Sequence, residues 1–336
     1  MKKISVFGAG SWGTALANLL GENGYSVTLW CRRLDQARAI NMRGENPNYL
    51  RGYRISPNVM ATSQIEEAMG SSKWVIALPT QAIRGFLNKV AGKMTKVPDL
   101  CNVAKGIEVE SMSTVSGIVK DVLGDVTYSV LSGPSHAEEV IQGLPTAVVV
   151  ASSSFEVAEQ WQTIFSCPNF RVYTSNDVSG VEIGGAVKNV IAIAAGIVKA
   201  MELGDNTLAA LVSRGLAEIM RLGARAGANP LTLSGLAGVG DLVVTCFSDH
   251  SRNMRLGLAI GKGKTMEDAL SELGQVAEGV FTAKALKKMG ENVGVELPIV
   301  DVVYDILYNN LPPAEALRTL LLRDPKPELP PAMQWM

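Results

Sequence analysis

The feature that most limits the possible folds is a glycine-rich loop placed directly after the first apolar run of the chain. Residues 4–7 read as a short strand, the segment Gly8-Ala9-Gly10-Ser11-Trp12-Gly13 follows at once, and residues 11–24 have helical periodicity. A strand, a G-x-G-x-x-G turn and a helix in this order are typical of a dinucleotide-binding βαβ unit. The first glycine would allow the tight turn, the second would let the backbone approach a pyrophosphate, and the third would let helix and strand pack closely. The N–H groups of Ser11 and Trp12 would bind the pyrophosphate. The alternative is a glycine-rich turn without a ligand.

The rest of the first half alternates between apolar runs and helical stretches. The apolar runs are residues 4–7, 26–30, 74–78, 100–103, 128–131 and 147–151. This alternation predicts βαβ units and a mostly parallel sheet, covered by helices on both faces. Because the runs are apolar throughout rather than at every second residue, the strands are expected to be buried on both sides. The predicted fold class is therefore α/β, with an N-terminal Rossmann-like dinucleotide-binding domain.

After about residue 177 the pattern becomes helical, and strand-like runs almost vanish. Helical stretches rich in Ala, Leu, Met and Gly are residues 178–202, 208–226, 253–261, 265–273 and 281–289. We therefore predict a dinucleotide-binding domain over 1–176 and an all-helical substrate and catalytic domain over 177–336. Two domains also suit a chain of 336 residues. The proline-rich tail from about residue 323 is expected to be extended or disordered.

Composition excludes several classes of function. A net charge of −1 argues against a nucleic-acid or anionic-membrane partner, but a locally positive pocket for an anionic small molecule stays possible. No membrane span is expected, because Lys188 and Lys199 bound the longest apolar candidate. The N-terminus does not read as a signal peptide, so a cytoplasmic location is expected. Four scattered cysteines and two histidines predict reduced thiols and no metal site.

The end of the second predicted strand bears on the choice of cofactor. An NAD-specific site usually places an acidic residue there to bind the ribose 2′-hydroxyl. This chain instead reads Leu29-Trp30-Cys31-Arg32-Arg33. Two guanidinium groups suit a 2′-phosphate, so NADP(H) is favoured. NAD(H) stays possible because arginine also stacks on adenine, and the two arginines could also be ordinary solvated loop residues.

Two lysines lie in surroundings that suggest chemistry. Lys105 follows a predicted buried strand, at the end of the sheet where open α/β folds bind ligands. The next such strand end carries Gly133 and Ser135. Lys188 lies in a helix among small and apolar residues, where lost hydration would lower its pKa into the range useful for proton transfer. The alternative is a lysine whose amine extends to the surface.

A glycine-rich segment and a helix start follow downstream. Three glycines between residues 235 and 240 suggest a tight loop that presents Asp241 to a catalytic lysine. Ser251, Arg252 and Asn253 open a predicted helix and offer a hydroxyl, a guanidinium group and free backbone N–H groups together. That combination suits a phosphate, although a serine N-cap alone would also explain Ser251.

Together these segments resemble the NAD(P)-dependent glycerol-3-phosphate dehydrogenases of bacterial type. The resemblance runs along most of the chain, through GAGSWGTALA, VAKGIE, LSGPSHAEEV, KNVIAIAAGI, GLAGVGDLVVTC, SRNMRLG and the Val276-to-Gly279 segment. It implies hydride transfer between NAD(P)H and dihydroxyacetone phosphate or sn-glycerol 3-phosphate. It further implies a homodimer that supplies glycerol 3-phosphate for phospholipid synthesis.

The resemblance also implies roles for individual residues. Lys188 matches the proton-transferring lysine, Asp241 an acidic residue of the active centre, and Lys105 a contact to substrate and cofactor. The substrate residues implied are Gly133, Ser135, Ser251, Arg252 and Asn253. The remaining cofactor-side positions implied are Ala137, Arg252, Val276 and Glu278.

Two departures and two rival functions stay open. His136 stands where phenylalanine is common, and Arg51 stands where many relatives have proline, which leaves the role of Tyr49 as a cofactor contact unsettled. One rival is a hydroxyacid dehydrogenase related to the 6-phosphogluconate or 3-hydroxyisobutyrate enzymes; the Asp241 segment and residues 251–253 argue against it. The other is an NAD(P)H-binding redox sensor, which would need neither the lysines nor the phosphate segment.

Overall fold

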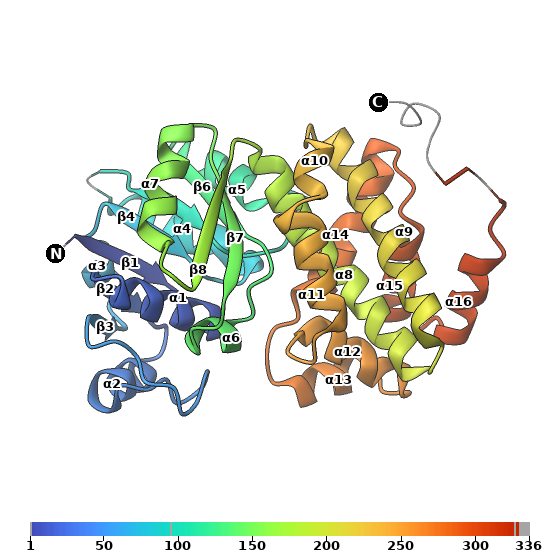
Figure 1. Cartoon of the computed structure of the whole chain (residues 1–336), viewed down its shortest axis with the longest axis horizontal. Coiled ribbons are helices and arrows are strands. Elements are labelled where there is room, and N and C mark those ends of the chain that lie inside the picture. Colours follow the sequence, from blue (N-terminus) through green and yellow to red (C-terminus); the bar gives the residue numbers. More distant parts are fainter. Residues whose placement is uncertain (1, 95, 326, 329–336) are drawn as a thin grey trace.

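The computed structural model describes residues 2–94, 96–325 and 327–328 and has two parts side by side (Figure 1). The first part is an eight-stranded sheet with the strand order β3-β2-β1-β4-β5-β6-β7-β8. Neighbouring strands pair in parallel, except that β6 and β7 are antiparallel. The strands are β1 Lys3–Phe7, β2 Ser26–Trp30, β3 Val59–Thr62, β4 Lys73–Ile76, β5 Asp99–Asn102, β6 Tyr128–Ser132, β7 Thr146–Ala151 and β8 Phe170–Ser175.

All six predicted strands are present, and the two missed strands are the two edges of the sheet. β3 contains four residues, of which Met60 is exposed. In β8, Arg171 and Tyr173 point outward between buried neighbours. An edge strand with one solvated face lacks the continuous apolar run by which a central parallel strand is found.

Helices cover both faces of the sheet. On one face α1 and α7 pack on the strands through residues such as Leu16 and Trp161, and on the other α4 and α5 pack through Leu87 and Ile118. The helices of this part are α1 Ser11–Glu22, α2 Leu34–Arg43, α3 Ile65–Ala68, α4 Thr80–Ala91, α5 Val115–Leu123, α6 Ala137–Ile141 and α7 Phe155–Phe165. The prediction of an α/β fold is confirmed.

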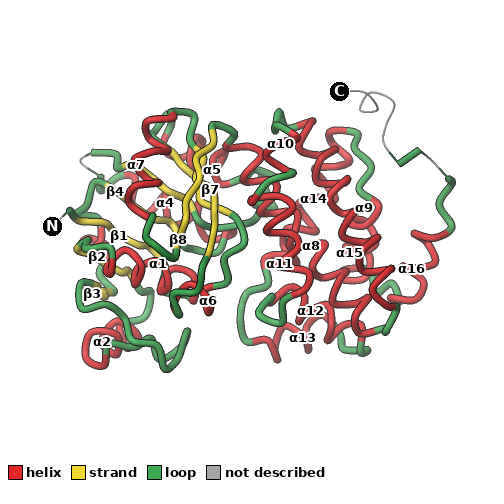
Figure 2. The backbone as a smooth tube through the Cα atoms, in the orientation of Figure 1, coloured by secondary structure: helices red, strands yellow, loops and turns green. Residues whose placement is uncertain are grey.

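The second part is helical, and no strand lies beyond Ser175 in the described portion of the chain (Figure 2). Its helices are α8 Val178–Ala200, α9 Gly204–Arg225, α10 Pro230–Leu233, α11 Asp241–Phe247, α12 Arg252–Gly261, α13 Met266–Leu273, α14 Glu278–Val293, α15 Pro298–Tyr308 and α16 Pro313–Leu321. The expectation of a tight loop before Asp241 is wrong, because residues Leu236–Gly240 form a π-helical turn (η1) that runs into α11. Of the predicted proline-rich tail, residues 323–325 and 327–328 lie outside helices and strands, and 326 and 329–336 lie outside the described residues.

Helix α8 forms the centre of the helical part. It crosses α12 at glycines: a Cβ atom added to Gly257 would lie 1.9 Å from the carbonyl oxygen of Ile193, and one on Gly196 would lie 2.0 Å from that of Met254. The two backbones therefore touch directly. This contact fixes the N-terminus of α12 relative to Lys188 on α8.

By length and composition, two helical stretches could cross a membrane, so the sequence argument that Lys188 and Lys199 interrupt the apolar run is too simple. The stretch Val178–Ala200 has a mean hydropathy of 1.7 and is 100% buried inside the protein. The stretch Pro230–Phe247 combines α10, η1 and α11. A buried core helix passes the same composition test, and Pro230–Phe247, of which 39% is buried, is built from three short helical segments. The two stretches are therefore weak evidence for a membrane span.

Candidate active site

The glycine-rich loop has the geometry that a bound pyrophosphate needs. Gly8 has φ +115°, and a Cβ atom there would lie 2.4 Å from the carbonyl oxygen of Ala77. A Cβ atom at Gly13 would lie 1.8 Å from the carbonyl oxygen of Gly8, so helix and strand meet at this residue. Beside Gly10, by contrast, a Cβ atom would meet nothing within 4 Å. No side chain caps α1 among the described residues, so the first N–H groups of the helix, those of Ser11 and Trp12, lack a side-chain acceptor, as the N-terminus of an anion-binding helix does.

A buried amide network that the sequence did not reveal holds this loop. The Nδ2 of Asn46 donates to the carbonyl oxygen of Ala9 (3.0 Å) and to Oγ1 of Thr14 (2.8 Å), and Gln36 Nε2 also donates to Ala9 (2.8 Å). The backbone N–H of Tyr49 donates to Asn46 Oδ1 (3.3 Å), so the Tyr49 segment lies beside the loop. Asn46 is 37 residues from Ala9, and no local pattern indicates such a contact.

The two arginines after β2 lie on the surface. Arg33 pairs with Asp35 at the start of α2, and both side chains are largely exposed. Arg32 is exposed, and no acidic residue stands between Trp30 and Arg33. One guanidinium group is therefore already paired, whereas that of Arg32 forms no ion pair with any described residue.

Lys188 lies at the centre of a buried polar cluster. Its side chain is buried, with only 6% of the residue exposed, and Nζ donates to Oδ1 of Asp241 and to Oγ1 of Thr245 (2.7 Å). Thr245 in turn donates to the backbone carbonyl of Asp241 (2.5 Å), which fixes both acceptors on one turn of α11. The alternative interpretation required an amine that extends to the surface, and the buried position of Lys188 Nζ contradicts it.

Lys105 reaches the same carboxylate from the sheet. Its Nζ donates to Oδ2 of Asp241 (2.7 Å), to the carbonyl oxygen of Gly133 (2.9 Å) and to Oγ of Ser135 (3.4 Å). Gly133 has φ +128°, a conformation that glycine adopts readily at this sharp turn after β6. Two strand ends of the first part and two helices of the second thus meet at Asp241.

When Lys188 is protonated, the cluster carries two ammonium groups and one carboxylate, which leaves one positive charge. Burial lowers the pKa of Lys188 from 10.5 to about 7, because the attraction of Asp241 does not fully offset desolvation and the repulsion of Lys105. Burial opposes ionisation of Asp241, but the charges of Lys105 and Lys188 outweigh it and hold the pKa of Asp241 below its ordinary value. An amine with a pKa near 7 both donates and accepts protons at neutral pH.

The predicted phosphate segment forms the N-terminus of α12. Ser251 is the N-cap, and its side chain accepts from the backbone N–H of Met254 (3.2 Å). Asn253 points into the core, where its amide donates to Oδ1 of Asn189 (2.9 Å) and accepts from the N–H of Gly279 (3.0 Å). Asn189 also donates to the carbonyl oxygen of Lys105 (2.9 Å). A hydrogen-bonded chain thus joins the α12 start to Lys105, while the side chain of Arg252 is exposed and forms no ion pair within 4.0 Å with any described residue.

The other predicted cofactor-side residues are spread around this junction. Glu278, at the start of α14, accepts from the backbone N–H of Thr80 (3.1 Å), the first residue of α4 in the sheet part. Its Oε2 is buried without a hydrogen-bond partner among the described residues, and burial raises the pKa of its carboxyl. Ala137 is the first residue of α6 and is buried, whereas Val276 is 41% exposed before α14.

His136 also lies at the junction of the two parts. From the sequence it was noted only as a departure from the family pattern. It is the N-cap residue of α6, and its ring lies 5.7 Å from the ring of His250 in the helical part. The Nε2 atom is buried and has no hydrogen-bond partner among the described residues. Burial, reinforced by the charge of Lys188, lowers the pKa of His136 to about 4, so the ring is neutral at pH 7. In the described residues, no group of three or more His, Cys, Asp or Glu side chains is arranged to hold a metal ion.

A glycine-rich βαβ unit beside a buried, positively charged lysine–aspartate–lysine cluster defines the chain as a nicotinamide-dinucleotide-dependent dehydrogenase. Comparisons with known proteins then identify the family. The sequence profile of the NAD-dependent glycerol-3-phosphate dehydrogenase N-terminus matches residues 3–158, and that of the C-terminus matches residues 177–318. The chain belongs to this family.

Individual relatives agree over nearly the full length. A protein of Pelotomaculum thermopropionicum named glycerol-3-phosphate dehydrogenase [NAD(P)+] is 48% identical over 96% of this chain and 93% of its own. One of Bacillus subtilis with the same name is 47% identical over 96% and 95%. The crystal structure of glycerol-3-phosphate dehydrogenase from Coxiella burnetii superposes with a TM-score of 0.93 at 36% identity and covers 96% of this chain and 99% of that one.

Proposed function

We propose that this chain catalyses reversible hydride transfer between NAD(P)H and dihydroxyacetone phosphate, which gives sn-glycerol 3-phosphate. The observation that carries the proposal is the buried amine of Lys188, held by Asp241, which also binds Lys105 at a strand end of the sheet part. The names of the relatives support the same reaction.

A nicotinamide dinucleotide, when bound, supplies or accepts the hydride. Gly8, Gly10 and Gly13 would admit its pyrophosphate, and the N–H groups of Ser11 and Trp12 would bind it. We further propose that the positions lining the rest of its path are Arg32, Arg33, Tyr49, Lys105, Ala137, Arg252, Val276 and Glu278.

The two lysines and Asp241 act on the substrate oxygen. When the ketone is reduced, negative charge develops on its oxygen, and the ammonium group of Lys188 stabilises that charge and donates a proton. In the oxidation direction the neutral amine of Lys188 takes the hydroxyl proton. Lys105 adds a second positive charge, and Asp241 holds both amines in place.

The phosphate of the substrate would bind at the start of α12. The N–H groups there, the hydroxyl of Ser251 and the guanidinium of Arg252 are the donors, while Asn253 braces the segment through Asn189. Gly133 and Ser135 would contact the triose end beside Lys105. Binding energy from the phosphate holds the reacting carbon in position.

We infer further that NADP(H) is favoured over NAD(H), because two arginines and no acid follow β2. The resemblance to the family supports a homodimeric, cytoplasmic enzyme whose product supplies phospholipid synthesis.

The reaction is tested in the oxidation direction. Glycerol 3-phosphate should reduce NADP⁺, and NAD⁺ more slowly, whereas glycerol, which lacks the phosphate, should be turned over poorly. Equal rates with glycerol and glycerol 3-phosphate would contradict the assignment of the phosphate site. Absence of reduction with either dinucleotide would favour the sensor interpretation.

A further inference from the structure

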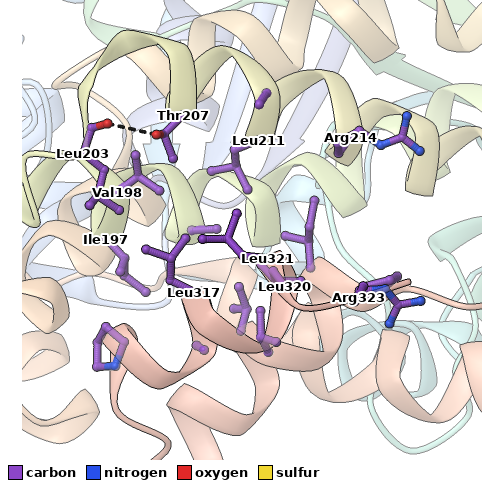
Figure 3. Close-up of a pocket in the computed structure, with 18 of the residues that line it drawn as sticks. Ile197, Val198, Leu203, Thr207, Leu211, Arg214, Leu317, Leu320, Leu321 and Arg323 are labelled. Carbon is purple, nitrogen blue, oxygen red and sulfur yellow. Dashed lines mark hydrogen bonds between the residues drawn. The ribbon is translucent and has the colours of Figure 1, made fainter. Parts of the chain in front are cut away.

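An apolar cavity lies in the helical part, lined by residues other than those of the Lys188 cluster. Its volume is about 380 Å³, and aliphatic side chains of α8, α9, α15 and α16 form most of its wall. In Figure 3, Leu211 of α9 stands on one side, and Leu317 and Leu320 of α16 stand on the other. Such a volume is typical of small-molecule sites, which run from about 300 to 1,000 Å³.

Positive charge gathers at one end of this cavity. Arg214 of α9 and Arg323, two residues beyond the end of α16, lie at that end, whereas Leu203 and Ile197 lie at the opposite end (Figure 3). Arg221 also lines the cavity. The cavity therefore has a charged end and a long apolar body.

The three arginines differ in their partners among the described residues. Arg323 pairs with Glu296 (2.8 Å). Across the described part of the chain, Arg214 and Arg221 form no ion pair within 4.0 Å; they donate to the backbone carbonyls of Glu328 (3.5 Å) and Glu296 (3.1 Å). Burial lowers the pKa of Arg221; the charges of Glu218 and Glu296 raise it in part, whereas those of Arg214 and Arg323 lower it, so the three guanidinium groups are close enough to repel one another.

The acidic groups of the lining do not neutralise this cluster. Glu218 and Asp324 line the cavity, but Glu218 accepts hydrogen bonds from the backbone N–H groups of Ile299 (2.7 Å) and Val300 (3.3 Å) at the start of α15. Burial raises the pKa of Glu218 to about 7, which further reduces its mean charge at neutral pH. With Glu296 included, the three guanidinium groups face three carboxylates, but Glu218 is partly protonated at neutral pH. Some positive charge therefore remains at this end to attract an anion.

We propose that the cavity binds a single-chain amphiphile of the fatty-acid carboxylate class, with its head group at Arg214 and its alkyl chain between α9 and α16. The apolar wall would bind the chain, and the guanidinium group of Arg214, which forms no ion pair with a described residue, would bind the carboxylate. This site is separate from the proposed hydride transfer, and its binding does not depend on that function.

The test is a calorimetric titration of the full chain with laurate below its micelle concentration. Two probes with the same alkyl chain serve as comparisons: dodecyl maltoside, with a neutral head, and dodecyltrimethylammonium, with a cationic one. We expect saturable binding of one laurate per chain, at least tenfold tighter than either comparison probe. Arg214→Gln should weaken laurate binding at least tenfold, and Ala210→Trp, which fills the cavity from α9, should abolish it. Arg225→Gln is the matched control, because Arg225 is exposed on the same helix outside the cavity.

Several results would overturn the proposal. These are no saturable laurate binding, equal binding of all three probes, or the same loss in Arg214→Gln and Arg225→Gln. Light scattering measures the molar mass during the titration. If Ala210→Trp halves the molar mass and the wild type does not bind laurate, a second copy of the chain covers the cavity instead. Circular dichroism of each variant checks folding, and wild-type competition between laurate and a fluorescent fatty acid gives an answer even where a variant does not fold.

Discussion

The amine of Lys188 is held by two acceptors of one helix turn, and its removal should affect chemistry more than binding. Lys188→Ala is expected to lower turnover by roughly 10²-fold or more, because positioned general acids contribute about 10²–10⁴-fold. NADPH binding, measured by calorimetry, should stay within about twofold, since the dinucleotide loop lies on another element. Lys199→Ala, on the exposed end of the same helix, is the control. Near-normal turnover of Lys188→Ala would refute the assigned role.

The lowered pKa of Lys188 gives the two reaction directions opposite pH profiles. In the proposed mechanism, reduction needs the protonated amine, so kcat/KM should fall with rising pH once the pH exceeds about 7. Oxidation needs the neutral amine, so kcat/KM should rise up to about pH 7 and then level off. Steady-state rates between about pH 6 and pH 9 measure this. Profiles with the same slope in both directions would show that another group transfers the proton.

His136 should make stability depend on pH. Its folded pKa of about 4 lies below its ordinary value of 6.5, so the unfolded chain binds a proton that the folded chain excludes. Stability is therefore lost as the pH falls from about 6.5 towards 4, by about 3 kcal/mol over the whole window. Urea unfolding of His136→Phe should lack this part of the loss, whereas His250→Phe should retain it. Equal pH dependence of the wild type and His136→Phe would contradict the burial argument.

At the scale of elements, the contact between α8 and α12 places the phosphate segment. Gly257→Ala puts a methyl group against the carbonyl oxygen of Ile193, so the helices must separate. We expect a loss of about 1–3 kcal/mol in the free energy of unfolding, and a higher KM for the phosphorylated substrate. Gly85→Ala in α4, where the added methyl meets nothing, should be neutral or stabilising. If Gly257→Ala is destabilised but its KM is unchanged, the contact between α8 and α12 does not position the phosphate site.

The side chain of Arg252 tests the proposed phosphate site at the N-terminus of α12. Arg252→Ala should raise KM for dihydroxyacetone phosphate about tenfold or more, since a charge-assisted hydrogen bond contributes roughly 1.5–3 kcal/mol. The KM for NADPH should change much less. Arg255→Ala, one turn later on the exposed side of α12, provides the comparison. An equal loss for phosphorylated and unphosphorylated substrates would count against a phosphate contact.

Local sequence patterns predict an element when the residues that determine it are neighbours in the sequence. The glycine loop, the six inner strands and the α12 start fall in this class, because turn geometry, burial and capping each depend on neighbouring residues. The π-helical turn before Asp241 was missed because a glycine-rich segment can form either a loop or a helical turn. The edge strands were missed because short, half-exposed strands lack a continuous apolar run. Gln36, Asn46 and Thr245 were missed because only folding brings them to the site.

At the scale of the whole molecule, buried polar contacts join the two parts. Glu278 meets Thr80 across 198 residues, Asn189 meets Lys105 across 84, and Glu182 accepts from the backbone N–H of Ser116 (2.9 Å) across 66. Each contact pairs a side chain of the helical part with a strand end or helix start of the sheet part. The lysine–aspartate–lysine cluster therefore forms only when both parts are folded together. Family resemblance indicated which residues matter, but composition and periodicity alone could not have placed them in contact.

The most direct test of the account is the oxidation of NADPH, followed at the nicotinamide absorbance, when dihydroxyacetone phosphate is added to the purified protein. The account predicts rapid oxidation by the wild type and a loss of roughly 10²-fold or more in Lys188→Ala. Folded wild-type protein that binds NADPH but does not oxidise it, with NADH giving the same result, would contradict it.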